Sequence, residues 1–282
     1  PARARAAIWR TALGALLAAA LIFGASVGVG LALAVLSPAD LDVLAFLDRP
    51  AGVAATLGSF AIWWIALAIV LRLLHRRRLR SLFGAGSGLR PFLAGFAAAM
   101  AFNLVGLALG WAIAGAPELS VRPLGLWLVW AVLALPLVLL QTGAEEAVFR
   151  GYLLQQLAAR FRSPWVWAAI PSILFGLLHW NPAAPGGVLP IMLVTGVIGF
   201  VLAALTAHTG GVAAAWGVHF GVNVFALLFV AAPDYLSGLA LATWARGEEA
   251  ALVWLDLALV LLFALCVALW IRRSQRGGST PP

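Results

Sequence analysis

The chain has 282 residues, of which 64% are hydrophobic and only 10% are charged, and its mean hydropathy is +1.04. Because soluble domains carry about 25% charged residues, this composition excludes a soluble globular protein and indicates a membrane protein with several spans. The net charge of +8 rests on arginine, since the chain has no lysine, and these arginines stand in short loops between apolar runs, so we predict no nucleic-acid partner.

Helices are the expected secondary structure, because lipid offers backbone groups no partners and the long apolar runs lack the alternation of strands. We therefore predict an all-α, polytopic membrane bundle with about eight transmembrane helices. In chain order, the expected helices cover 8–36, 51–74, 91–115, 124 to about 160, 164–180, 188–207, 212–231 and 251–271.

The loops between these helices alternate between arginine-rich and arginine-poor, which is the pattern of the positive-inside rule. With both termini in the cytoplasm, only Arg49, Arg122 and Arg246 fall outside. This asymmetry predicts cytoplasmic termini and an even number of spans. The arginines expected inside are Arg3, Arg5, Arg10, Arg76, Arg77, Arg78, Arg80, Arg90, Arg160, Arg162, Arg272, Arg273 and Arg276, and the neighbouring His75 is expected at the membrane interface.

The fourth apolar run ends in charged residues, in the sequence LPLVLLQTGAEEAVFRGYLL. A charge near a bilayer centre costs a few kcal/mol, so such residues mark functional sites. Glu146 and Arg150 are four apart with the acid first, which favours an ion pair and leaves Glu145 free to act as a general base. The alternative is a helix end at the membrane surface with both acids solvated, because residues 124–144 already suffice to span a bilayer.

The fifth helix carries Phe175 and His179, four apart and therefore on one face. Glu145 and His179 lie equally far along the chain from residue 162, in the hairpin between the fourth and fifth helices. Two regular antiparallel helices would place them at similar depth. The alternative for a lone histidine near a helix end is a structural or interfacial role.

The seventh helix carries His219 and Asn223, also four apart, and the small residues Gly217 and Gly221 let a neighbouring helix approach closely. The alternative is a polar pair that joins helices by hydrogen bonds. His219 lies near the start of its helix, whereas Glu145 and His179 lie far from their hairpin. We therefore expect the fourth and fifth helices to project beyond the membrane, or the seventh helix to begin earlier.

A carboxylate, two histidines and an amide on three helices can hydrolyse an amide bond in two ways. In the first, Glu145 takes a proton from water, His179 orients that water, and His219 and Asn223 donate to the oxyanion. In the second, His179, His219 and Glu145 bind zinc, the one candidate cofactor, which acidifies the water. No HExxH motif and no nucleophilic serine motif is present.

The ordered motifs EExxxR (Glu145 to Arg150), FxxxH (Phe175 to His179) and HxxxN (His219 to Asn223) resemble the CPBP family. This family contains CAAX prenyl proteases, the Ras-converting enzyme among them, and bacteriocin-processing or immunity proteins of the Abi type. The resemblance implies an α-helical intramembrane endopeptidase, often labelled a metalloprotease, whose site opens to the cytoplasm. By the same match, Glu145 activates water with His179 as its partner, His219 and Asn223 form the oxyanion side, and Glu146 and Arg150 complete the first motif.

The resemblance covers roughly 91–230, the expected catalytic core of a single membrane domain over 1–282. Residues 1–90 hold the first two helices and a basic cytoplasmic loop, and 231–282 hold an outer loop, the last helix and a basic tail. The implied partners are membrane lipid and a protein or peptide substrate, prenylated or not. The alanine-rich, lysine-free composition suggests a GC-rich bacterial genome, and hence a bacterial plasma membrane.

Two other classes of function compete with this interpretation. One is a non-catalytic immunity or partner-binding protein of the same fold, which would not need Glu145, His179 and His219 together. The other is a transporter with an intramembrane proton site. Transporters often contain inverted repeats and broken helices, and the sequence has no internal repeat.

Overall fold

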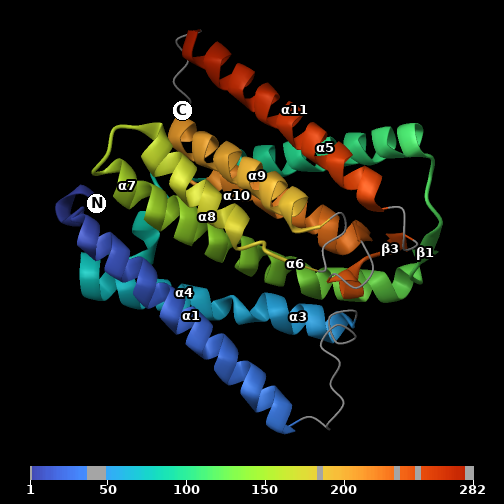
Figure 1. Ribbon diagram of the computed structural model, residues 1–282, viewed down its shortest axis with the longest axis horizontal. Coiled ribbons are helices and arrows are strands. Elements are labelled where there is room, and N and C mark those ends of the chain that lie inside the picture. Colours follow the sequence, from blue (N-terminus) through green and yellow to red (C-terminus); the bar gives the residue numbers. More distant parts are fainter. Residues whose placement is uncertain (1, 37–48, 183–186, 232–235, 245–248, 277–282) are drawn as a thin grey trace.

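The computed structural model describes residues 2–36, 49–182, 187–231, 236–244 and 249–276. Its helices lie side by side in one elongated bundle, with a small sheet at one end (Figure 1). Arg246, expected outside the membrane, lies beyond the described residues. The helices are η1 (Ala2–Arg5), α1 (Ile8–Leu36), α3 (Pro50–Ser59), α4 (Ala61–Val70), η2 (Leu71–His75), η3 (Leu79–Leu82), α5 (Leu89–Ala114), α6 (Leu124–Glu146), η4 (Ala147–Leu154), α7 (Gln155–Ala158), η5 (Trp165–Ala169), α8 (Ile170–Leu177), α9 (Val188–Thr209), α10 (Ala213–Val224), η6 (Phe225–Phe229), η7 (Ser237–Leu239) and α11 (Glu249–Arg276).

The predicted polytopic helical bundle is confirmed. Within the described residues, six helices are long and apolar enough to cross a membrane, and Trp165–Leu177 and Ala213–Phe229 are shorter apolar helices. Large apolar side chains also cover the outside of the bundle, as Leu16, Phe23 and Val132 are 69%, 72% and 68% exposed. A surface of this kind is stable in lipid and not in water.

Four of the helical segments, η2, η4, η5 and η6, are π-helical, with wider turns than an α-helix. Such turns occur often at functional sites. The longest continuous helix, Leu124–Ala158, contains α6, η4 and α7. At a rise of 1.5 Å per residue it is about 50 Å long, well beyond the roughly 30 Å of a hydrocarbon core. This length favours the expected projection of the fourth helix beyond the membrane.

The fifth helix is shorter than predicted. It was expected to reach Trp180, but α8 ends at Leu177 and places His179 in the turn that follows. The main-chain N–H of His179 donates to the carbonyl of Gly176 at 3.0 Å, which closes this turn. His179 is therefore held at a helix end and not within a helix.

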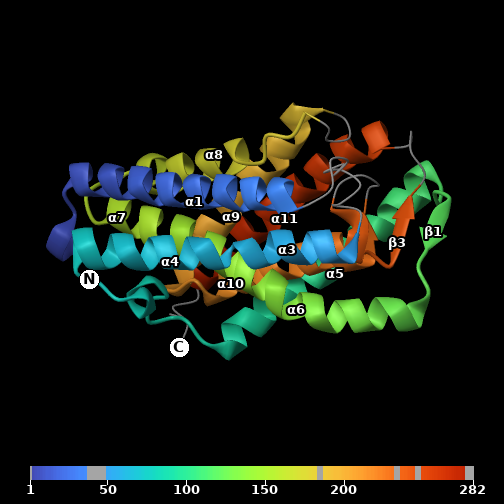
Figure 2. The ribbon, with the colours of Figure 1, turned by 90° about the horizontal axis from the view of Figure 1, so that it is seen from below.

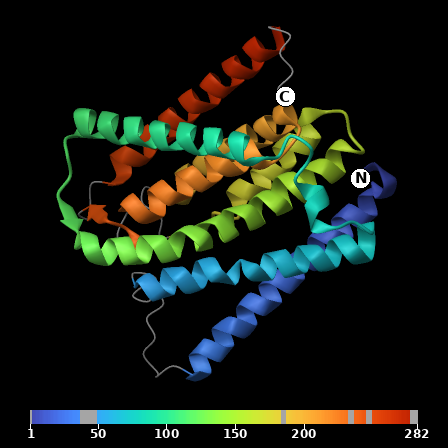
Figure 3. The same ribbon diagram turned by 180° about the vertical axis from the view of Figure 1, so that it is seen from behind.

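Helix α10 lies at the centre of the bundle, between α5 and α6 and against α9 (Figure 3). Glycines allow this packing, because a Cβ atom at Gly217 would overlap the carbonyl of Phe92, and one at Gly221 would lie 2.8 Å from the Ala99 Cβ. A Cβ atom added at Gly95 of α5 would likewise overlap the carbonyl oxygen of Ala214 in α10. The close helix approach expected from Gly217 and Gly221 is confirmed.

A three-stranded sheet, which the sequence analysis did not predict, closes one end of the bundle. It contains β1 (Leu119–Val121), β2 (Val230–Ala231) and β3 (Ala242–Trp244) in the order β1-β3-β2, with β1 antiparallel and β2 parallel to β3. Arg122 fixes this end, donating from Nη2 to the carbonyl of Gly238 at 2.9 Å and from Nε to that of Ala240 at 3.2 Å. The three strands follow α5, η6 and η7, so the sheet connects three separate loops of the chain.

The N-terminal helix η1 and the end of α11 lie towards the opposite end of the bundle from the sheet (Figure 2). The loop with Arg76, Arg77, Arg78 and Arg80 lies at this same end, whereas Arg122 lies at the sheet. The two ends of the bundle thus differ in arginine content. Which end faces the cytoplasm stays a prediction.

His75 is a correction to the sequence analysis. It was expected at the interface, yet it is 3% exposed, with Nε2 at 2.9 Å from the Tyr152 hydroxyl and Nδ1 at 3.1 Å from Nε2 of Gln156. It therefore connects the end of η2 to the long helix from inside the bundle.

Substitution of Gly217 by alanine tests the central packing. The added methyl group meets main-chain atoms of α5, which cannot move without shifting the helix, so we expect a loss of about 1–3 kcal/mol of stability. Thermal unfolding in detergent measures it. Gly125→Ala is the matched control, because nothing lies within 4 Å of a Cβ there, and alanine favours the helix. Equal melting temperatures for both variants would contradict the packing described.

Candidate active site

Four ionisable side chains meet inside the bundle. Glu145 and Glu146 end α6, Arg150 lies in η4 and His219 in α10, and they are 7%, 1%, 1% and 4% exposed. An unpaired buried charge costs several kcal/mol, so groups of this kind need partners of opposite charge and hydrogen bonds. The two acids are therefore inside the protein and not solvated at a helix end.

The expected ion pair between Glu146 and Arg150 is present. Arg150 Nη1 lies 2.8 Å from Glu146 Oε1, and Nη2 donates to the carbonyl of Gly199 in α9 at 3.0 Å. The guanidinium carbon also stands 4.8 Å from the ring centre of Phe175, within cation–π range. Arg150 thus joins η4, α8 and α9 through three different interactions.

His219 joins the two glutamates. Its Nδ1 is 2.9 Å from Glu146 Oε1, and its Nε2 is 3.3 Å from Glu145 Oε2. The Arg150 guanidinium binds the same Glu146 oxygen, so this carboxylate is the acceptor and Nδ1 of His219 is the donor. The second contact is an ion-pair distance without hydrogen-bond alignment, since Glu145 Oε2 has no hydrogen-bond partner among the described residues.

The contact between His219 and Glu145 is attractive when a proton lies between the two groups. A neutral imidazole that donates through Nδ1 has a lone pair on Nε2, which would repel an ionised carboxylate. A proton on either Nε2 or Glu145 removes that repulsion. With Arg150 balancing Glu146, one proton between His219 and Glu145 leaves the four groups with no net charge, as a low-dielectric interior favours.

The ring of Phe175 separates the second predicted histidine from this cluster. Its centre lies 5.6 Å from the ring of His219 and 4.8 Å from that of His179, both edge to face. His179 donates from Nδ1 to the carbonyl of Phe175 at 2.8 Å, which leaves Nε2 as an acceptor. No ion pair or hydrogen bond joins His179 to Glu145 within the described residues. Their predicted partnership stays a prediction.

Asn223 lies one helical turn beyond His219, and its side-chain amide donates to Oε1 of Gln141 at 2.9 Å. Gln141 is 6% exposed and precedes Glu145 by one turn of α6. One N–H group of Asn223 is thus engaged, and the second is available to another acceptor. Gln141 was not among the predicted site residues, although an amide in an apolar run one helical turn before two acids is itself an unusual signal.

Two further neighbours were also missed. Trp216 donates to the hydroxyl of Thr142 at 3.1 Å, and Trp64 donates to the carbonyl of Leu140 at 3.1 Å. Both rings press on Gly143, where an added Cβ would lie 2.6 Å from Trp216. These tryptophans fix the helix turn before Glu145, and their sequence positions resemble those of any interfacial tryptophan.

The three predicted zinc ligands do not form a metal site in this structure. Glu145 and His219 are in contact, but no group of three His, Cys, Asp or Glu side chains among the described residues is placed to hold a metal ion. Both ring nitrogens of His219 already face carboxylates. The donor set therefore does not fit the three-ligand zinc of a hydrolase.

Comparison with known proteins places this geometry in context. Residues 123–225 match the family described as type II CAAX prenyl endopeptidase Rce1-like. Over this region the chain is similar to that family. The resemblance predicted from the three motifs is thus confirmed, and the match contains all seven predicted site residues, Glu145, Glu146, Arg150, Phe175, His179, His219 and Asn223.

The Rce1-like region is narrower than the core expected at 91–230. The chain is also 33% identical over 154 residues to the uncharacterised protein YyaK of Bacillus subtilis (strain 168), which covers 54% of this chain. The chain spans about half the length of that relative, 50%. No solved structure matches the chain.

Substitution of Arg150 by glutamine tests the buried ion pair between Arg150 and Glu146. It leaves Glu146 buried without its cation, and breaking one side of a buried pair costs about 3–5 kcal/mol. We expect a large drop in the melting temperature in detergent. The exposed Arg160, changed to glutamine, is the control and should alter stability by less than about 0.5 kcal/mol. Similar melting temperatures for both variants would show that the pair does not stabilise the fold.

Proposed function

We propose that the protein is a CAAX-type intramembrane endopeptidase in which Glu145 activates the attacking water. One observation carries this proposal: a buried carboxylate oxygen, Glu145 Oε2, faces His219 and has no hydrogen-bond partner among the described residues. Buried polar atoms are nearly always satisfied, so each exception needs an explanation, and a catalytic role is one such explanation. The family match supports the same reaction class.

Glu145 and His219 act as one proton-holding pair in this proposal. When the proton lies on His219, Glu145 is an ionised base, and its Oε2 accepts a proton from water as the water oxygen attacks the substrate carbonyl. The carbonyl becomes a tetrahedral oxyanion. The proton on Glu145 then passes to the leaving nitrogen, the C–N bond breaks, and an acid and an amine are released.

Asn223 and His179 are the proposed groups at the oxyanion and the water. The free N–H of Asn223 is a suitable donor to the oxyanion, since its other N–H is held by Gln141. His179, with Nδ1 fixed on the Phe175 carbonyl, presents Nε2 to orient the water. His219 is proposed here as the partner of Glu145 and not as an oxyanion donor, because both of its nitrogens face acids.

Glu146 and Arg150 are positioning residues in this mechanism. Glu146 holds Nδ1 of His219, which fixes the direction in which Nε2 meets Glu145. Arg150 in turn holds Glu146 in place through their ion pair. The two acids of the motif thus have different roles, one structural and one chemical.

The substrate class rests on the family match alone. We propose a protein or peptide that reaches the site from the membrane interface, with the site open to the cytoplasm of a bacterial cell. Prenylation of the substrate is a question for experiment. A panel of prenylated and unprenylated peptides of the same sequence answers it directly.

Replacement of Glu145 by glutamine tests the mechanism. The amide cannot take a proton from water, so we expect cleavage of a responsive peptide to fall at least about a hundredfold, with the melting temperature little changed. Glu118→Gln is the control, because Glu118 is an exposed acid outside the site. Cleavage at the wild-type rate by the Glu145 variant would overturn the proposal. Absence of cleavage by the wild type across the panel would favour the non-catalytic alternative.

Exhaustive chelation tests the metal route separately. The donor set of the site does not fit a zinc ion, so we expect the cleavage rate of the purified protein to be unchanged after chelation. Re-addition of zinc after chelation is the control. Loss of activity on chelation with recovery on zinc addition would show that the reaction needs zinc and would overturn the metal-free mechanism.

A further inference from the structure

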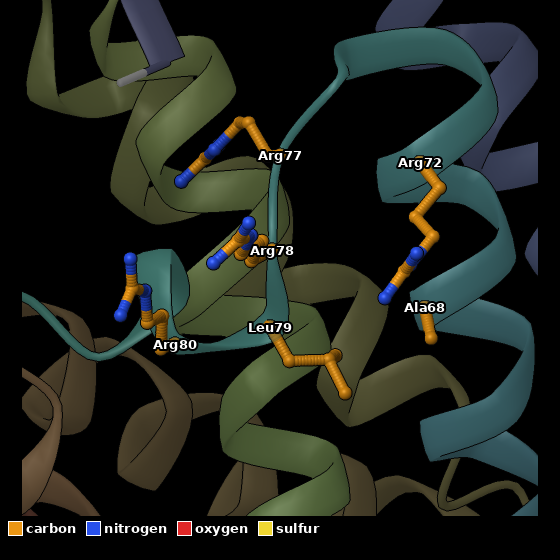
Figure 4. A pocket seen from close by; sticks show the side chains of 6 residues that line it. All are labelled: Ala68, Arg72, Arg77, Arg78, Leu79 and Arg80. Carbon is orange, nitrogen blue, oxygen red and sulfur yellow. The ribbon is translucent and has the colours of Figure 1, made fainter.

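A cavity lined by arginines lies away from the proposed active site. It has a volume of about 270 Å³, and its walls are Ala68, Arg72, Arg77, Arg78, Leu79 and Arg80. Figure 4 shows that Arg77, Arg78 and Arg80 belong to one loop and that Arg72 comes from the helix beside it. A second cavity of about 270 Å³ shares Arg72, Arg77 and Arg78 and adds Arg76. We refer to residues 76–80 as the arginine loop.

The positive charge of this cavity is not balanced within the described residues. No ion pair joins any of its arginines to an acid there, and the side chains of Arg72, Arg78 and Arg80 are exposed. Like charges held close together repel one another. A group of neighbouring arginines that has no acid beside it therefore favours an anion as its partner.

Arg77 is the buried member of the group. It is 7% exposed, and its guanidinium binds the carbonyl of Ser81 at 3.0 Å and Oε1 of Gln155 at 2.7 Å, both neutral acceptors. Its Nη1 has no hydrogen-bond partner among the described residues. Burial lowers the pKa of this guanidinium. Nη1 of Arg77 can therefore donate a hydrogen bond to one more acceptor.

The arginine loop is held rigidly, as a binding site requires. Gln155 donates to the carbonyl of Leu82 at 2.6 Å, and an added Cβ at Gly151 would lie 2.8 Å from the Leu82 Cβ. At the other end, His75 is fixed by Tyr152 and Gln156. Between them Arg76 has a φ of 53°, a left-handed conformation that turns the chain sharply after the helix. The backbone of the loop and the side chain of Arg77 are thus held in place by the surrounding helices.

The position of the cavity indicates which kind of anion it takes. The apolar span Pro50–His75 ends at the cavity, and a helix that spans a bilayer ends at the level of the headgroups. Ile65, Ile69 and Leu73, spaced four apart on this helix, are 61%, 37% and 66% exposed and form an apolar stripe that leads to Arg72. An acyl chain fits such a stripe, and a phosphate fits the planar donors of arginine.

We propose that the arginine-lined cavity binds the phosphodiester headgroup of an anionic membrane phospholipid, with the acyl chains along Ile65, Ile69 and Leu73. Basic pockets at the ends of transmembrane helices bind anionic lipid headgroups for the same electrostatic reason. This site is independent of cleavage. It lies beside Gln155, about 15 Å further along the long helix than Glu145.

Lipid binding by the purified full chain tests the proposal. The probes are fluorescent phosphatidylglycerol and phosphatidylcholine, titrated into protein in neutral detergent. We expect phosphatidylglycerol to bind at least about tenfold more tightly, and the variant with Arg72, Arg78 and Arg80 all changed to glutamine to lose this preference. Arg77 is left unchanged because it holds the loop.

The matched control removes the same charge elsewhere. Arg272, Arg273 and Arg276 at the end of α11 are also exposed, and changing all three to glutamine should leave the preference intact. Equal loss in both triple variants, or no preference in the wild type, would overturn the proposal in favour of diffuse attraction. Competition by inorganic phosphate distinguishes a lipid headgroup from free phosphate as the ligand. If phosphate at millimolar concentration displaces the fluorescent lipid completely, the site binds soluble phosphate and not lipid. Unchanged melting temperatures verify that each variant is folded.

Discussion

The buried charge of Arg150 is the constraint on which the rest of the structure depends. A guanidinium that is 1% exposed is stable only where other groups surround it with acceptors. Here those acceptors come from different elements: Glu146 from the end of α6, and the Gly199 carbonyl from α9, with the Phe175 ring of α8 over its face. The contacts of Arg150 therefore hold together the helices of the proposed active site and also fix the position of Glu146 within it. His219 joins this assembly from α10 by sharing Glu146.

The outline of the fold follows from the sequence because apolar runs and arginine clusters mark helix ends strongly in a membrane protein. The helices begin and end within a few residues of their predicted limits, and the largest differences are at the ends of α8, which stops at Leu177, and α11, which continues to Arg276. The π-helical turns and the three-stranded sheet were not predicted. A π turn differs from an α turn by one hydrogen-bond step, and the strands of the sheet hold only two or three residues each from distant loops. Neither leaves a periodic pattern in the sequence.

The candidate site was predicted as a set of residues and not as a set of contacts. The four-residue spacing of Glu146 and Arg150 sufficed to predict their ion pair, because both lie on one helix. The bridge from His219 to both acids depends on how α10 is rotated against α6, and the close packing of Gly217 against α5 constrains that rotation. His75 shows the same limit, since its partners Tyr152 and Gln156 are 77 and 81 residues away. Local spacing predicts partners within a helix but not between helices.

The π-helical segment η4 has a consequence for how the long helix is organised. Each π turn holds about one residue more than an α turn, so η4 is equivalent to an α-helix with a residue inserted. The side chains before it, Glu145 and Glu146, face α10, whereas Tyr152 in its last turn and Gln155 after it face His75 and the arginine loop. The insertion sets the angle between these two faces. One helix thereby serves two separate surfaces, the charged cluster with α10 on one side and the arginine loop on the other.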